Sequence, residues 1–502
     1  MLNISKKILS PLLIVTTLFI FFLTRSAELL SRNYVFVLDQ GRDYVAISEM
    51  IANHKITLIG SEIGGGYAGF SGIFQGPFHY YFLSIFYVLF QGDPYGGIVY
   101  MFLFACFALI ASYFVARKIF HNSLVALCVS LLVAISPPII SQAKYTWNPH
   151  PISVFIVLIF LFLYLSYNGR KKYIFLTGLV ASFTYNFEIA STVPIVLAIL
   201  IYYVFVLRLK SIKQYGVLVV GGVLGMLPFF LFEVRHNFMA FNGFVAYVST
   251  PGKDEKSGYS LVNNHLDSFI YNFGDTFSYQ TSIPVLLPLI LFFLILAYLL
   301  RREKRKEVKT FQYFLLILIG TTLFVLSFLR NHIFMYYLYQ LNFVYIFLFG
   351  YILYASVIQK KKYITYAFAC VLIVLSIYSI NHGIKDFTND YYDYGGSSKI
   401  KGKKEAVDFI YKDAQGKQFG LFTFAPGVFT YPYDYTAQWY GKNKYGYSPN
   451  TNKDGLFYLL IEEDKYIKQA SKGWMETVIK TGEIVKTTKL KSGLVVQKRY
   501  GK

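Results

Sequence analysis

Charged residues are scarce in this sequence. They make up 15% of the 502 residues, whereas 55% are hydrophobic and 19% are aromatic. A soluble globular protein has about 25% charged residues, because polar side chains cover its surface. The composition therefore excludes an ordinary water-soluble protein and predicts a chain embedded in a membrane.

Cysteines and metal-binding motifs are also few. Cys106, Cys128 and Cys370 all lie in hydrophobic runs, where a cysteine usually packs as a small apolar side chain. The sequence has no HExxH motif, no paired cysteines and no phosphate-binding loop, and "DYYD" near residue 390 is a weak acidic motif. We therefore expect no tightly bound metal and no cofactor.

Acidic residues are outnumbered by basic ones, 27 to 48, which gives a formal net charge of +21. In a soluble protein such a charge would suggest a nucleic-acid partner. Here the basic residues fall mainly between hydrophobic runs and in the C-terminal region. Membrane topology explains many of them, and we expect no nucleic-acid binding.

Eleven hydrophobic runs are long enough, or nearly so, to cross about 30 Å of hydrocarbon. Every second connecting segment is basic, which is typical of cytoplasmic loops. The pattern predicts a polytopic α-helical membrane protein with about 11 transmembrane helices, its N-terminus inside and its C-terminus outside. The runs begin near residues 9, 97, 123, 151, 173, 193, 215, 283, 311, 334 and 363, and the basic segments are 6–7, 116–120, 168–172, 208–213, 301–309 and 359–362.

The first external loop, residues 26–95, contains two predicted surface helices. Residues 39–53 place apolar side chains on one side and charged side chains on the other. Residues 77–90 are apolar but short for a span, and counting them as a span would move the basic segments outside. We assign them to an interfacial helix. The glycine-rich residues 60–77 are then a loop able to cover a site.

The composition changes again toward the C-terminus. Residues 1–381 form the predicted membrane module, and residues 382–502 form a small extracytoplasmic α/β domain. Residues 431–447 within this domain are dense in tyrosine, which suits carbohydrate stacking or an ordinary packed loop. The periodicity predicts helices at 403–414 and 464–479 and strands at 418–425, 456–463, 482–490 and 493–500.

Asp39 is the first acidic residue at a position that suggests chemistry. It lies about a dozen residues after the first span, at the predicted outer boundary between water and lipid. A carboxylate there can act as a general base if the site also holds a hydroxyl-bearing acceptor and an activated donor. It can equally cap the N-terminus of the surface helix, and the two roles are compatible.

Several motifs in a fixed order resemble the GT-C glycosyltransferases. They are "LDQGRDYVAISEM" at 38–50, "GPFHYYFL" at 76–83, "DP" at 93–94 and "TWNPHP" at 146–151. The pattern is most similar to the family 39-like group that uses polyprenyl-phosphate sugars, the protein O-mannosyltransferases and aminoarabinose transferases. The resemblance covers about residues 8–240.

The resemblance implies that Asp39 is the catalytic carboxylate and that the donor is a lipid-linked sugar from the outer leaflet. Gln40 stands where relatives often have a second acidic residue, and Asp43 either replaces its function or pairs with Arg42. "WNP" at 147–149 stands where aminoarabinose transferases have an aspartate, which leaves the acceptor open.

Other polar residues near predicted span ends are candidates for substrate binding. Within "FEVRHNF", Glu233 can orient Arg235, whose planar guanidinium suits phosphate oxygens, although a cation at this boundary can equally contact lipid headgroups. Glu188 lies beside an apolar hairpin, where an ionisable group suggests a function. The substrate-binding candidates are Arg42, Asp43, His79, Lys144, Trp147, Asn148, Glu188, Glu233, Arg235, His236, Arg330 and His332.

These features predict an inverting glycosyltransferase in the cell membrane, with its active site on the extracytoplasmic face. Asp39 would deprotonate an acceptor hydroxyl on a glycan, lipid or protein, while cations stabilise the departing lipid phosphate. The main alternative is a transporter or flippase of lipid-linked sugars, although we find no internal repeat and few charges at mid-membrane. A surface receptor or scaffold that works through residues 382–502 is a third possibility.

Overall fold

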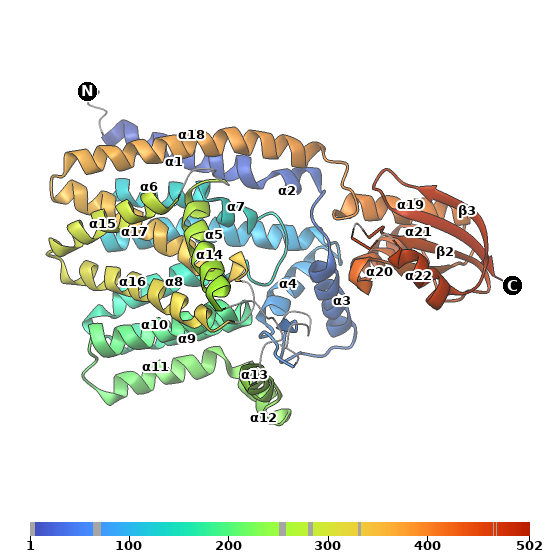
Figure 1. Ribbon diagram of the computed structural model, residues 1–502, viewed down its shortest axis with the longest axis horizontal. Coiled ribbons are helices and arrows are strands. Elements are labelled where there is room, and N and C mark those ends of the chain that lie inside the picture. The colour runs from blue at the N-terminus through green and yellow to red at the C-terminus, as the bar shows by residue number, and fades with distance from the viewer. Residues whose placement is uncertain are drawn as a thin grey trace.

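The computed structural model describes residues 6–63, 72–249, 258–279, 285–329, 333–464, 466–467 and 469–501. Figure 1 shows a bundle of roughly parallel helices at one end of the molecule and a small α/β domain at the other. The helices α3 and α4 of the first external loop lie between these two parts. The chain therefore brings the loop that carries Asp39 to the junction of the bundle and the domain.

Each of the eleven predicted runs contains a helix. Among the described residues, six helices are long and apolar enough to cross a membrane, and a seventh candidate is the pair Ile212–Gly225 and Leu227–Arg235, bent by 68°. The predicted membrane protein is confirmed, whereas the count of 11 spans stays a prediction. The helices are α1 (Lys6–Arg25), α5 (Tyr95–Phe120), α6 (Ser123–Ile135), α8 (Ile152–Leu165), α9 (Lys171–Phe183), α10 (Ile189–Ile201), α11 (Ile212–Gly225), α15 (Leu286–Arg301), α16 (Lys306–Ser327), α17 (Tyr339–Ile358) and α18 (Lys362–Tyr392).

The bundle is built around α17, nearly all of whose residues are buried. By contrast, α1 and α18 pack side by side at the edge of the bundle and expose large apolar side chains such as Phe19, Val374 and Ile377. Exposed apolar side chains of this kind are expected where a helix faces lipid, because the bilayer replaces water as the solvent. The boundary expected at residue 382 falls within α18, which continues to Tyr392.

Residues 26–95, the segment predicted to be the first external loop, contain α2 (Ala27–Ser31), α3 (Leu38–Ala52) and α4 (Phe78–Leu89). The structure identifies Val37, and not Asp39, as the N-cap of α3. Gln40 explains this start, because its side-chain oxygen accepts the Val37 N–H at 3.0 Å and its amide donates to the Thr146 carbonyl at 2.7 Å. Asp39 therefore lies in the first turn of α3 with its side chain free of the capping role. Of the glycine-rich loop 60–77, residues 64–71 lie outside the described residues.

Shorter helices complete the membrane-side part. They are α7 (Pro137–Ser141), α12 (Leu227–Arg235), α13 (Met239–Ser249) and α14 (Gly258–Phe277). In Figure 1, α12 and α13 lie near the junction, and the α12 side chain of Phe232 packs against Phe74 of the first external loop with ring centroids 5.7 Å apart.

The C-terminal domain has a four-stranded sheet of order β1-β2-β4-β3, in which β1 and β2 are parallel and the other pairs are antiparallel. The four predicted strands are confirmed. Residues 431–447, the expected tyrosine-rich loop, are largely helical instead, starting with a proline in the first turn of α20. The elements are α19 (Ile400–Ala414), β1 (Gly420–Phe424), α20 (Tyr431–Thr436), α21 (Lys442–Tyr445), β2 (Gly455–Ile461), α22 (Ala470–Trp474), β3 (Glu483–Lys489) and β4 (Val495–Gly501).

Candidate functional site

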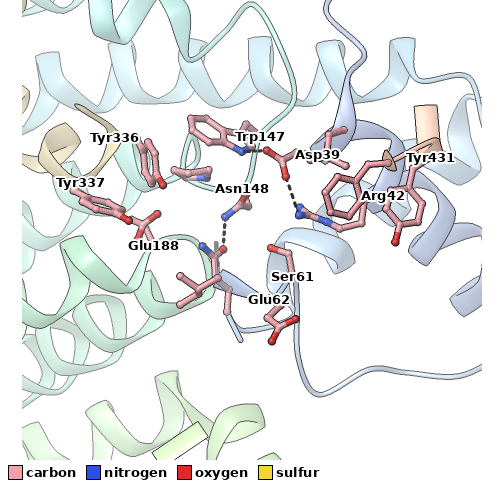
Figure 2. A pocket seen from close by; sticks show the side chains of 15 residues that line it. Asp39, Arg42, Ser61, Glu62, Trp147, Asn148, Glu188, Tyr336, Tyr337 and Tyr431 are labelled. Atoms are coloured by element: carbon pink, nitrogen blue, oxygen red, sulfur yellow. Dashed lines mark hydrogen bonds and ion pairs between the residues drawn. The ribbon is translucent and has the colours of Figure 1, made fainter. Parts of the chain in front are cut away.

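A cavity of about 390 Å³ lies where α3, the ends of several membrane helices and the C-terminal domain meet. Figure 2 shows Asp39, Arg42 and Tyr431 on one side and Glu188, Tyr336 and Tyr337 on the other. Segments that are distant in sequence therefore converge on one space. The lining residues are Leu38, Asp39, Arg42, Ser61, Glu62, Ile63, Gln75, Trp147, Asn148, Pro149, Glu188, Tyr336, Tyr337, Phe429 and Tyr431.

Asp39 presents its carboxylate to this cavity from the first turn of α3. Its Oδ1 accepts a hydrogen bond from Arg42 Nη1 at 2.8 Å, and its Oδ2 accepts one from Trp147 Nε1 at 3.0 Å (Figure 2). Its side chain remains 35% exposed. Burial raises the pKa of Asp39, although the Arg42 cation opposes that shift. The result is an oriented carboxylate that is more basic than an ordinary aspartate and has lone pairs left for a substrate.

Arg42 joins Asp39 to a second, buried carboxylate. Its Nε and Nη2 donate to Asp43 Oδ1 at 3.0 and 2.8 Å, and Tyr80 OH donates to the same oxygen at 3.3 Å. His79 Nε2 lies 3.5 Å from Asp43 Oδ2. Burial by itself raises the pKa of Asp43, but Arg42 and His79 together hold it below its usual value. Asp43 is thus a fixed anion that holds the guanidinium in place beside Asp39.

The "TWNPHP" segment forms part of the cavity wall between α7 and α8. Asn148 Nδ2 hydrogen bonds to Gln75 Oε1 and donates to the Phe187 carbonyl at 3.1 Å, which ties this wall to the first external loop. The ring of Trp147 packs edge-on against Tyr336, with centroids 4.8 Å apart. His150 is buried behind them, and burial lowers its pKa to about 3, so its imidazole is neutral.

Glu188 lies across the cavity from Asp39 and begins α10. Its Oε1 accepts the Ala190 N–H at 3.0 Å, so this carboxyl is a helix cap. It is 2% exposed, and burial raises its pKa to about 8. A carboxyl with that pKa is mostly protonated at neutral pH and can donate a hydrogen bond into the cavity, whereas Asp39 can only accept one when ionised.

Other predicted residues lie away from the lining. His79, on α4, contacts Asp43 of α3. Lys144 pairs with Asp390 at 2.7 Å and lies 3.7 Å from Glu28, so it links the start of the first loop to the end of α18. Arg330 and His332 lie outside the described residues.

The predicted phosphate-binding segment also lies apart from the lining. Glu233 accepts the backbone N–H groups of Ala240 and Phe241 at 3.0 and 2.9 Å. Arg235 is exposed, and the ring of His236 stacks on Phe232 with centroids 4.1 Å apart. In this structure Glu233 orients the start of α13, and no hydrogen bond to Arg235 is seen among the described residues.

Several lining residues are absent from the set that the sequence suggested. Ser61, Glu62 and Gln75 come from the glycine-rich loop, and Tyr336 and Tyr337 come from the turn before α17. Phe429 and Tyr431 come from the C-terminal domain, where the high density of tyrosine is the only signal in the sequence. Among the described residues no group of three or more histidine, cysteine, aspartate or glutamate side chains is arranged to hold a metal ion.

The sequence matches no known family profile and no curated protein. The structure is similar to that of ArnT from Cupriavidus metallidurans bound to undecaprenyl phosphate, with a TM-score of 0.58, 13% sequence identity and coverage of 97% of each chain. It is also similar to apo ArnT from the same organism, with a TM-score of 0.55, 13% identity and the same coverage. The chain has the fold of ArnT, so the expected fold is confirmed, and the similarity extends well beyond the first 240 residues that carried the resemblance.

Proposed function

We propose that this protein is a membrane glycosyltransferase. In this proposal it transfers a sugar from a polyprenyl-phosphate donor to an acceptor hydroxyl, with inversion at the anomeric carbon. The observation that carries the proposal is the position of Asp39 in a cavity at the membrane-helix ends of a chain with the fold of ArnT. ArnT itself was solved bound to undecaprenyl phosphate, which supports a polyprenyl-phosphate donor here.

Asp39 acts as the general base in this mechanism. The acceptor hydroxyl gives its proton to the Asp39 carboxylate as its oxygen forms a bond to the anomeric carbon. The bond between that carbon and the lipid phosphate breaks on the opposite face, and the phosphate leaves with the electron pair. Arg42 and Trp147 hold the two carboxylate oxygens, and the raised pKa of Asp39 makes the carboxylate a better proton acceptor.

The departing lipid phosphate requires positive charge. The acidic and basic residues of the described lining are Asp39, Glu62, Glu188 and Arg42. Arg42 is the one cation among them, and it is already paired with Asp39 and Asp43. A further cation is therefore expected from residues around the entrance of the cavity, outside its described lining. Arg235 and His236 are near the first external loop through the contact between Phe232 and Phe74, and Arg330 and His332 remain candidates from the sequence.

The basic segments predict that this cavity opens on the extracytoplasmic side of the cell membrane. The donor then reaches it from the outer leaflet, and the acceptor is a glycan, a lipid or a protein at the cell envelope. No metal is needed in this scheme, because the lipid phosphate is already a good leaving group and Asp39 supplies the base.

The proposal is tested with the purified protein in lipid nanodiscs and a panel of polyprenyl-phosphate sugars. We expect release of free lipid phosphate from at least one donor, together with transfer of its sugar. A flippase would instead move the intact donor across the membrane of a proteoliposome, without cleavage. Movement of label with no lipid phosphate released from any donor would overturn the transferase.

A further inference from the structure

Two aromatic side chains of the C-terminal domain line the cavity that holds Asp39. Phe429 and Tyr431 precede and begin α20, and their rings stack nearly parallel, with centroids 6.2 Å apart and an angle of 18°. Figure 2 shows Tyr431 beside Arg42, on the far side of the cavity from Tyr336 and Tyr337. The C-terminal domain therefore supplies one wall of the proposed active site.

This wall is held in place by close packing of α20 on α3. Gly41 faces α20 so tightly that a Cβ atom there would lie 2.4 Å from the backbone nitrogen of Pro432. Tyr435 OH donates to the Gly92 carbonyl at 2.6 Å, and its ring packs edge-on against Tyr44 at 5.3 Å. The helix that carries Asp39 and the helix that begins with Tyr431 are thus one packed unit.

A second attachment lies at the base of the domain. Val35 and Lys399 form an antiparallel bridge, in which Phe36 N–H donates to the Ser398 carbonyl and Ile400 N–H donates to the Tyr34 carbonyl, both at 3.0 Å. The domain therefore contacts the first external loop at two separate places, one at α20 and one at the start of α19.

The two walls of the cavity differ in what can approach them. Trp147, Glu188, Tyr336 and Tyr337 come from the ends of membrane helices, which a lipid-linked donor reaches from the bilayer. The wall with Phe429 and Tyr431 belongs to the C-terminal domain, which lies beyond the end of the helix bundle (Figure 1). The base must touch the acceptor, and Asp39 with Arg42 lies on the same side of the cavity as Tyr431.

We infer that Phe429 and Tyr431 form the acceptor subsite and that the acceptor presents a carbohydrate ring to them. This inference rests on the proposed function. A pair of stacked aromatic rings offers a rigid, flat and partly apolar surface, which matches the C–H face of a pyranose and costs little conformational entropy. Arg42 and Glu62 line the same cavity and offer polar partners for the hydroxyl groups of that ring. One of these hydroxyls is then within the same cavity as the Asp39 carboxylate.

The test measures binding of a panel of fluorescently labelled hexose oligosaccharides to the full-length protein in nanodiscs by fluorescence anisotropy. We expect Tyr431→Ala and Phe429→Ala each to lower the affinity for the tightest-binding oligosaccharide by about tenfold or more. Tyr431→Phe, which keeps the ring, should restore most of the affinity. Tyr466→Ala is the matched control, because Tyr466 is 96% exposed in the same domain and does not line the cavity. Binding of undecaprenyl phosphate should be unchanged in all four variants.

Absence of oligosaccharide binding by the unmodified protein would overturn this inference, as would equal affinity in Tyr431→Ala, Phe429→Ala and Tyr466→Ala. A parallel loss of undecaprenyl phosphate binding would also overturn it, because the rings would then support the donor side or the fold. These outcomes are separate from the donor-cleavage assay. Lipid phosphate release with no dependence on the aromatic pair overturns only the acceptor subsite. Oligosaccharide binding without release from any donor overturns the transferase and leaves the aromatic pair as a carbohydrate-binding site.

Discussion

Two charged segments that follow membrane helices look alike in the sequence and differ in the structure. One spans Asp39 to Asp43 at the start of α3, and the other spans Glu233 to His236 at the end of α12. Each combines a carboxylate with an arginine two or three residues later. In both, the carboxylate accepts two hydrogen bonds, but Asp39 takes them from side chains and Glu233 takes them from the backbone of α13.

The difference in partners follows from the difference in surroundings. Asp39 borders a cavity of about 390 Å³ and is 35% exposed, whereas Glu233 is 3% exposed and lies away from that cavity. Glu233 is a buried carboxylate that accepts hydrogen bonds from two backbone N–H groups, and this structural role accounts for its position. Asp39 keeps an open side, so only its segment combines an oriented charge with space for a substrate. Substitutions in the two segments test this contrast.

The largest effect is expected for Asp39→Asn. The amide keeps the shape of the side chain but cannot accept a proton at neutral pH, so the initial rate of lipid phosphate release should fall at least about hundredfold. The thermal unfolding midpoint should change little, because the side chain is partly exposed.

Asp454→Asn is the matched control for Asp39→Asn. Asp454 is an exposed residue of the C-terminal domain that does not line the cavity, and the control should keep the full rate. Undiminished transfer by Asp39→Asn would contradict the catalytic role of Asp39. Asp39 would then have only a structural role, like Glu233.

Asp43→Asn should have the next largest effect, and mainly on stability. Asp43 is buried with Arg42, Tyr80 and His79 around it, and loss of one member of a buried ion pair costs about 3–5 kcal/mol of unfolding free energy. Arg42 then loses the anchor that aims it at Asp39, so the rate should also fall. Chemical denaturation followed by circular dichroism measures the first effect. Wild-type stability in this variant would show that Asp43 does not fix the guanidinium.

Glu233→Gln tests the other side of the contrast. The glutamine amide can accept only one of the two N–H groups of Ala240 and Phe241, and an unsatisfied buried N–H group costs about 1–3 kcal/mol. Stability should fall while the rate per folded molecule stays within about twofold. Glu463→Gln is the matched control, since Glu463 is exposed and its ion pair with Lys489 contributes little. A lost rate with unchanged stability would assign Glu233 to the reaction.

The sequence carries enough information for the membrane class, the helices α3 and α4 and the sheet of the C-terminal domain. Long apolar runs and strand alternation are local patterns, so periodicity detects them. The distance of Asp39 from the first span also singled this residue out, and the structure places it in the cavity lining. The exact start of α3 was not predicted, because Gln40 caps it through the backbone of Val37 and a contact with Thr146 that is distant in sequence.

The wall of the cavity was much harder to predict. Phe429 and Tyr431 reach Asp39 only because α20 packs on α3 through Gly41 and Pro432, and no local pattern encodes a contact between residues almost 400 positions apart. The short helical segments in residues 431–447 were missed for a similar reason, since their aromatic side chains pack against the first external loop. Deletion of the C-terminal domain would also remove Phe429 and Tyr431 from the cavity wall, so that deletion tests the site as well as the domain.

The smallest effect is expected for Arg235→Ala, which tests whether the second segment contacts the donor phosphate. Arg235 is exposed, so its loss should change the unfolding free energy by less than about 0.5 kcal/mol. If it meets the donor phosphate at the rim, the KM for the donor should rise about two- to threefold with kcat unchanged, and the rise should shrink in high salt because exposed charges are screened. Lys210→Ala, in a predicted cytoplasmic segment, is the control for loss of a boundary cation. A tenfold fall in kcat for Arg235→Ala would place Arg235 at the reacting phosphate, and the second segment would then share the chemistry of the first.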